Sequence, residues 1–160
     1  SVVLLTHHND DESIGLILNQ PTKINLNEIL NNIPLSDFPV YIGGPLAKQS
    51  LQFIHTLGKL IPESKQITEN IYFGGDFNTI LKLMQDRKIT KNEIRFFVGY
   101  SGWGEDQLNT EIREDSWLVE SLKDDLCMKY STSKLWNKII RNQKSDYAIW
   151  VNMPKDPNLN

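Results

Sequence analysis

Short apolar runs that end in or next to glycine are the feature that most constrains the fold of this chain. Val40–Gly44 and Ile71–Gly75 share the pattern aliphatic, tyrosine, apolar, glycine, glycine, and Arg95–Tyr100 is a third run with glycine close to its end. Runs rich in β-branched and aromatic residues are typical of buried strands, and glycine is typical of the points where strands end. Strands and helices do not alternate strictly along the chain, which favours an α+β fold over a doubly wound sheet.

Two helices are predicted from caps followed by apolar stripes. Asn25 precedes a stripe that continues to Ile33, and Glu28 completes a capping box. Asp76 precedes a second stripe, over Phe77–Met84. The other predicted elements are strands over 1–6, 14–18, 40–42, 51–57, 71–73, 95–100, 116–119 and 147–151, and helices over 106–113 and 133–141.

Composition limits the classes of function. The 160 residues carry a formal net charge of −3 from 17 basic and 20 acidic side chains, so a broad basic face for nucleic acid is not expected. Two local groups of basic residues are interpreted as solvated helix faces. One group is Lys82, Arg87, Lys88, Lys91 and Arg95, and the other is the stripe Lys134, Lys138 and Arg141. The single cysteine, Cys127, excludes an internal disulfide framework and is expected to be inert.

The apolar runs are too short to cross a membrane, and no secretory leader pattern is visible. We therefore expect a cytoplasmic protein without membrane partners.

An ordered series of motifs resembles the YqgE/AlgH family of bacterial proteins over nearly the whole chain. The motifs are Ser1–Leu5, His8-Asn9, Gly15–Pro21, Gly43–Pro45, Phe53–Leu57, Gly99–Trp103, Gln107-Leu108, Glu111-Ile112, Ser116–Leu118 and Leu135-Trp136. The resemblance implies an α+β fold with a bifurcated mixed β-sheet that includes a small closed barrel and is surrounded by helices. It implies one domain over 1–160 that lacks a first strand, and it supplies no catalytic residues. Some members carry the label of transcriptional regulator, which the acidic total charge argues against here.

The glycine turns are the candidate ligand site. Their bare amides would bind an anion if the turns converged on one pocket, although backbone crowding or positive φ explains the same glycines. The candidate residues are Gly43, Gly44, Gly74, Gly75, Ser101 and Gly102.

Ser101 is the most reactive candidate for catalysis. Gly99–Trp103 departs from the G-x-S-x-G motif of serine hydrolases because position 103 is tryptophan. A serine nucleophile also needs a histidine base, for which His7, His8 and His55 are available.

The polar stretch His7–Glu12 is interpreted as a hairpin turn in preference to a metal site, and no cofactor is expected. The leading hypothesis is a non-enzymatic binding or regulatory protein with an unknown protein or small-molecule partner. The alternative is a hydrolase-like or anion-binding enzyme built on the glycine turns and Ser101. Homo-oligomerisation stays open.

Overall fold

The computed structural model describes residues 1–31, 33, 37–121, 123–128 and 135–141. The strands are β1 (Val3–His8), β2 (Ser13–Ile17), β3 (Pro21–Asn25), β4 (Pro39–Ile42), β5 (Leu46–His55), β6 (Lys65–Gln66), β7 (Tyr72–Phe73) and β8 (Ile94–Trp103). The helices are α1 (Leu26–Ile29), α2 (Phe77–Gln85), α3 (Gln107–Arg113), α4 (Asp124–Met128) and α5 (Leu135–Arg141), with a 3-10 turn over Gly58–Leu60. The predicted α+β class is confirmed.

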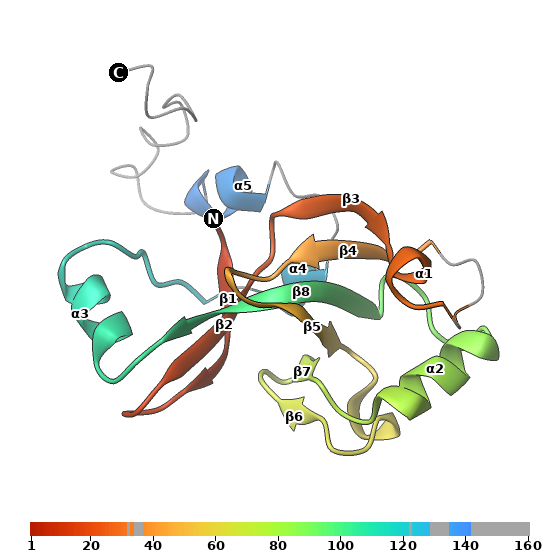
Figure 1. Cartoon of the computed structure of the whole chain (residues 1–160). Helices are drawn as coiled ribbons and strands as arrows, with labels where there is room; N and C mark the ends of the chain where they lie inside the picture. Colours follow the sequence, from red (N-terminus) through yellow and green to blue (C-terminus); the bar gives the residue numbers. More distant parts are fainter. Residues whose placement is uncertain (32, 34–36, 122, 129–134, 142–160) are drawn as a thin grey trace.

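The described strands form one sheet that forks at β8. The main path runs β1-β2-β8-β5-β7-β6, while β4 also pairs with β8 and carries β3 on its other side. The β4–β8 pairing is parallel and the other pairings are antiparallel, so the sheet is mixed as expected. Figure 1 shows the strands curling into a half-barrel, with α2 and α3 at opposite ends of β8.

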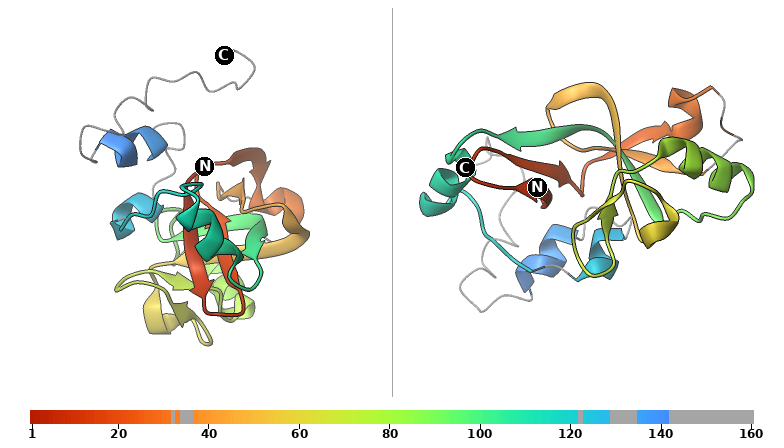
Figure 2. Two further views of the ribbon diagram at one scale, coloured as in Figure 1. Left: turned by 90° about the vertical axis from the view of Figure 1, so that its left-hand side faces the viewer. Right: turned by 90° about the horizontal axis from the view of Figure 1, so that it is seen from below.

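β1 and β2 form the predicted hairpin. Asn9 shapes its turn, because the side-chain oxygen accepts the amides of Asp11 and Glu12 at 3.0 and 2.8 Å. An asparagine that bonds backbone two and three residues ahead is typical of tight polar turns. The view from below in Figure 2 shows this hairpin reaching toward α3.

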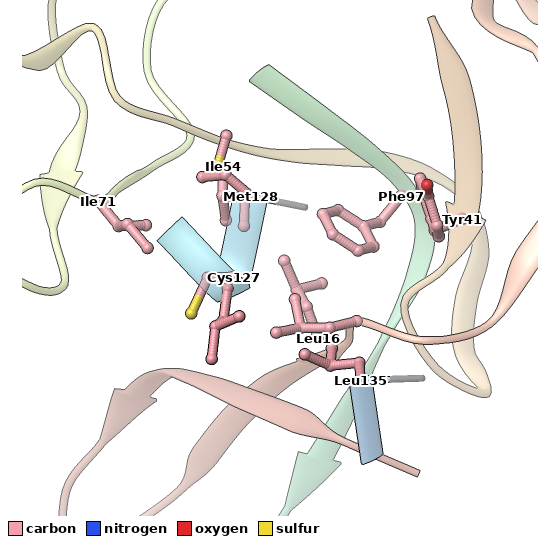
Figure 3. Packing of buried hydrophobic residues seen from close by; sticks show 10 residues of the cluster. Leu16, Tyr41, Ile54, Ile71, Phe97, Cys127, Met128 and Leu135 are labelled. Carbon is pink, nitrogen blue, oxygen red and sulfur yellow. The ribbon is translucent and has the colours of Figure 1, made fainter. Parts of the chain in front are cut away.

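Both faces of the sheet pack against helices, and the alternation of side chains along the central strands explains how. On one face Val40, Phe53 and Phe96 pack with residues of α2, and on the other Tyr41, Ile54 and Phe97 pack with residues of α4 and α5. Figure 3 shows the second cluster, where Cys127 and Met128 reach toward the sheet.

The two predicted helix caps have different outcomes. Asp76 caps α2 as expected, accepting the amides of Asn78 and Thr79 at 3.3 and 3.0 Å. Glu28 accepts the amide of Asn25 at 2.8 Å, yet α1 stops at Ile29 instead of continuing to Ile33. The backbone is extended at Leu30, so the apolar stripe outlasts the helix.

Several predicted boundaries are wrong. Strand β3 was missed because its apolar content is low and it begins with proline, which strands tolerate at their first residue and at sheet edges. The segment 116–119 is not a strand, and β6 and α4 were not predicted. β8 continues through Ser101 to Trp103 where a turn was expected. The strand predicted at 147–151 and the first two residues of the helix predicted at 133–141 lie outside the described residues.

Candidate functional site

Strands β4, β5 and β8 meet at a group of small residues that we call the glycine junction: Gly43, Gly44, Gly99, Ser101 and Gly102. A β-carbon on Gly44 would lie 2.2 Å from the carbonyl carbon of Tyr100, and one on Gly43 would lie 2.3 Å from the carbonyl oxygen of Gly99. Contacts this short are excluded by van der Waals repulsion. Glycine is therefore required here so that the turn after β4 can cross directly over the backbone of β8.

Gly74 and Gly75 lie in a different part of the sheet, so the candidate glycines do not converge on one pocket. The amide of Gly74 donates to the carbonyl of Phe53, whose partner on β8 is Phe96, whereas Gly44 crosses β8 at Tyr100. That separation along β8 is roughly 13 Å at the rise of a strand. Both glycines have positive φ, at 63° and 111°, and introduce α2, whose first amides already bond to the Asp76 carboxylate.

Ser101 is buried, with 8% of its surface exposed, and its hydroxyl donates to the carbonyl oxygen of Gly43 at 3.3 Å. His55 pairs with Ile94 at the other end of β8, seven residues and roughly 23 Å away along the strand. His8 bonds instead to Ser13, with 2.7 Å between Nδ1 and Oγ. Among the described residues no histidine is placed as a base for Ser101.

His55 is a structural histidine with a defined tautomer. Its Nδ1 accepts the amide of Leu57 at 3.2 Å, so the proton is on Nε2, which donates to the carbonyl of Gly74 at 3.1 Å. The ring stacks on Tyr72 with 5.7 Å between centroids. Burial lowers the pKa of His55, and the bond to Gly74 opposes that shift only in part. The neutral ring thus joins β5 to the turn after β7.

The hairpin turn is formed by Asn9–Glu12, as predicted, whereas His7 and His8 belong to β1 and pair with β2. The Nδ1 atom of His7 lies 2.7 Å from Nζ of Lys65 on β6, so this side chain links the hairpin to the far end of the sheet. No group of three or more potential metal ligands occurs in the described part of the chain.

Beside the glycine junction, β5 carries a wide bulge that the sequence did not predict. Leu46 pairs with Tyr100 and Leu51 with Val98, so the four residues Ala47–Ser50 stand opposite Gly99 alone. They line a shallow open concavity on the surface. A side chain on Gly99, which has φ of 70°, would meet the carbonyl oxygens of Gly44 and Leu46, each at 2.7 Å. The polar residues Lys48, Gln49 and Ser50, directly before Leu51, are the sequence signal that could have indicated this bulge.

The bulge is strained as well as exposed. Ala47 adopts φ of 45°, a left-handed conformation that costs a non-glycine residue about 1 kcal/mol. The Ser50 hydroxyl donates to the Ala47 carbonyl at 2.8 Å and accepts from the Gln52 amide at 3.2 Å, which holds this shape. Two apolar side chains, Ile42 and Leu46, are exposed on either side of the adjoining turn.

Arg95 was expected among solvated basic residues, and this expectation is wrong. Its side chain is fully buried, and its guanidinium donates to the carbonyls of Leu18 and Cys127 at 2.8 and 2.5 Å. It also lies over the Tyr41 ring. Arg95 therefore joins α4 to the residue that follows β2, while Lys82, Arg87, Lys88 and Lys91 are exposed as expected. For Lys138 and Arg141 the side chains lie outside the described residues, as does Lys134.

The aromatic residues of the α3 region form a second polar cluster. One carboxylate oxygen of Glu111 accepts from the indoles of Trp103 and Trp117, at 3.0 and 2.6 Å. The other oxygen accepts from Gln107 at 3.0 Å. These bonds, led by the one from Trp117, lower the pKa of Glu111.

None of the helices that the structure describes is long and apolar enough to cross a membrane.

Comparison with known proteins identifies the family. The family model described as AlgH-like (DUF179) matches residues 1–148. UPF0301 proteins of Parabacteroides distasonis and Bacteroides thetaiotaomicron are 36% and 38% identical over 162 residues, which span all of this chain and 82% of each relative. A UPF0301 protein of Cytophaga hutchinsonii is 35% identical over 161 residues, all of this chain and 88% of the relative.

Solved structures of low sequence identity share the fold. The AlgH protein from Pseudomonas aeruginosa superposes with a TM-score of 0.76 at 17% identity, over 96% of this chain and 84% of that one. A crystal structure from Corynebacterium diphtheriae gives a TM-score of 0.73 at 17% identity, over 94% and 81% of the two chains. On the family match and these relatives, the chain belongs to the AlgH-like family.

Proposed function

We propose that this protein acts by binding a partner molecule at the surface formed by the bulge Ala47–Ser50 with Ile42 and Leu46. The observation that carries the proposal is the left-handed Ala47 in an exposed bulge. Bulges and strained backbone conformations are enriched at functional sites. They persist there because the surrounding structure holds them against relaxation.

The chemistry of this surface suits a partner with an apolar centre and polar edges. Ile42 and Leu46 are 38% and 44% exposed, and Lys48 and Gln49 stand beside them on the bulge. Protein interfaces combine an apolar core with a polar rim in this manner. In this proposal Gly43, Gly44, Ser101 and Gly102 contribute by holding the backbones beneath the surface together. The partner is a protein or a small apolar molecule.

Binding is favoured over hydrolysis because the Ser101 hydroxyl is directed to the Gly43 carbonyl and lies far from His55 along β8. A regulatory role would then be exercised through the partner and not through DNA, in keeping with the net charge of −3. The proposal places the protein in the cytoplasm, which its single cysteine supports.

The test is a quantitative affinity capture from the native cell with wild type, a Leu46→Ser/Lys48→Glu variant and a Leu60→Ser variant. Leu60 is an exposed leucine on the 3-10 turn and serves as the matched control. We expect mass spectrometry to find a protein or metabolite retained by wild type and Leu60→Ser and lost from the double variant. Identical retention by all three proteins would refute the proposed surface.

A further inference from the structure

The connection from α3 to α4 presents apolar side chains that no other described residue covers. Leu118 and Val119 are 42% and 65% exposed, and they are neighbours. In Figure 1 this connection follows a long arc from α3 back toward the centre of the molecule. Exposed apolar side chains that lie next to one another, unlike those scattered singly, are typical of interaction sites.

The backbone of this segment also lacks backbone hydrogen-bond partners among the described residues. Among the described residues, the amides and carbonyls of 118–121 form no hydrogen bond with another backbone group. The run Trp117–Val119 has the composition of a strand, and yet none of the described strands pairs with it. Such a segment is suited to add to the edge of a partner's sheet, where main-chain bonds supply affinity and alternate side chains supply specificity.

One end of the segment is fixed, which limits the entropy lost on binding. The indole of Trp117 donates to Glu111 at 2.6 Å and packs edge-on against Trp103, with 5.8 Å between ring centroids. Trp103 is itself buried at the end of β8. The apolar pair is therefore presented from a rigid anchor and not from a free tail.

The charge around the segment identifies the kind of partner. Residues 105–125 carry eight acidic and two basic side chains, a net charge of −6, while the whole chain carries only −3. The acids nearest the apolar pair, Glu114, Asp115 and Glu120, are exposed, and none forms an ion pair with another described residue. This field repels nucleic acid and anionic membranes and attracts a basic protein surface.

We infer that residues 117–121 are a docking segment for a protein partner that offers an apolar strand or groove edged by lysine and arginine. This inference is independent of the surface around Ala47, because the two rest on different segments. The docking segment follows α3, while the bulge belongs to β5.

Three synthetic octapeptides test the inference with the full chain. Alternating leucine and lysine reproduces the expected partner, alternating leucine and glutamate reverses its charge, and alternating serine and lysine removes its apolar face. We expect only the leucine–lysine peptide to bind, with amide chemical-shift changes centred on residues 117–121. Its affinity should fall by about tenfold between ~0.05 and ~0.5 M salt. Equal binding of the leucine–glutamate peptide, or shift changes centred elsewhere, would overturn the inference.

Variants separate the contributions of the apolar and acidic groups. Leu118→Ser/Val119→Ser should weaken binding of the leucine–lysine peptide by about tenfold or more, because the substituted side chains are exposed in the free protein and central in the complex. Glu114→Gln/Asp115→Asn/Glu120→Gln should remove most of the salt dependence. Leu60→Ser, 58% exposed elsewhere, should bind within about twofold of wild type.

Two results would assign the segment differently. Unchanged affinity in the Leu118→Ser/Val119→Ser variant would show that the apolar pair is not used. A wild-type dimer in sedimentation that this variant abolishes would show that a second copy of the chain covers the pair, which overturns the assignment to a basic partner.

Discussion

The guanidinium carbon of Arg95 lies 4.2 Å from the centroid of the Tyr41 ring, and both side chains are buried in the core. The face of an aromatic ring attracts a cation, by about 2 kcal/mol or more where water is excluded. Burial raises the pKa of Tyr41, and the neighbouring guanidinium opposes that rise only in part, so the phenol stays protonated. The positive charge of Arg95 is therefore stabilised by aromatic ring faces and backbone carbonyls at the point where α4 meets the sheet.

Replacing Arg95 with lysine should destabilise the protein. A single ammonium group cannot reproduce the planar fork that donates to Leu18 and Cys127 at once, and it is more costly to remove from water. We expect the free energy of unfolding to fall by about 3 kcal/mol in chemical denaturation. The exposed Arg87→Lys is the matched control and should change stability by less than about 0.5 kcal/mol. Equal effects of the two substitutions would contradict the structural role of Arg95.

The glycine junction predicts a sharp difference between two glycine-to-alanine substitutions. A β-carbon at Gly44 would meet the Tyr100 backbone at 2.2 Å, and backbone cannot rotate out of the way, so Gly44→Ala should cost about 3 kcal/mol or more. Gly104 has no neighbour within 4 Å of the same position, and Gly104→Ala should be close to neutral. The difference between the two midpoints in urea measures the effect. A folded Gly44→Ala protein of wild-type stability would refute the close crossing of β4 and β8.

His55 predicts a pH dependence of stability. Burial lowers the pKa of the folded state below the ordinary value of 6.5, so the unfolded chain binds a proton that the folded chain excludes. The free energy of unfolding should fall as the pH drops below 6.5, with a slope of at most about 1.4 kcal/mol per pH unit.

Urea denaturation at several pH values from about 5.5 to about 7.5 measures this slope. This interval extends about one unit on either side of the ordinary histidine pKa and lies above the pH range in which carboxyl groups titrate. His55→Phe should abolish it while lowering stability at every pH, because Gly74 and Leu57 lose their partner. Tyr72→Phe keeps the stacked ring and should keep the slope. An unchanged slope in His55→Phe would exclude His55 as its source.

Local signals in the sequence predicted their own surroundings well. The hairpin turn at Asn9 and the cap at Asp76 depend on side chains that bond to backbone two or three residues away, so they can be interpreted from a short stretch. The alternation of Phe53 and His55 likewise identified the second half of β5. The fold class followed from these elements together with the family resemblance.

Features that depend on distant partners were not predictable. The bulge at Ala47 exists because β8 has Gly99 opposite it, and Arg95 is buried because α4 supplies a carbonyl from 32 residues further along the chain. The run Trp117–Val119 has strand composition, but it pairs with none of the described strands. The sequence around one residue does not reveal such pairings. The candidate glycines could therefore be identified, but the sequence could not show that Gly43 and Gly44 lie apart from Gly74 and Gly75.

Glu111 should control the order of the two tryptophans at the end of β8. The indole bonds, that of Trp117 first, lower the pKa of its carboxyl below the ordinary value of 4.5. A depressed folded pKa contributes stability that is present above pH 4.5 and is lost as the pH falls through the lower, folded value. Near-ultraviolet circular dichroism of the tryptophans should therefore persist at pH 4.5 and decline below it. Glu111→Ala should reduce this signal already at neutral pH, while Glu105→Gln, on an exposed neighbour, should not. A wild-type spectrum from Glu111→Ala would contradict the contact.

Cys127 should resist modification for as long as α4 stays packed. Burial, with a further contribution from Asp124, raises the pKa of its thiol to about 11, so only about one molecule in a thousand carries the reactive thiolate at pH 8. An aromatic disulfide reagent should react slowly with the native protein and rapidly in guanidinium chloride. Because the carbonyl of Cys127 is held by Arg95, Arg95→Lys should accelerate the native reaction, and Arg87→Lys should not. Absorbance of the released thiolate gives both rates. Rapid labelling of the native wild type would show that α4 opens freely, and equal rates in the two variants would show that Arg95 does not hold it closed.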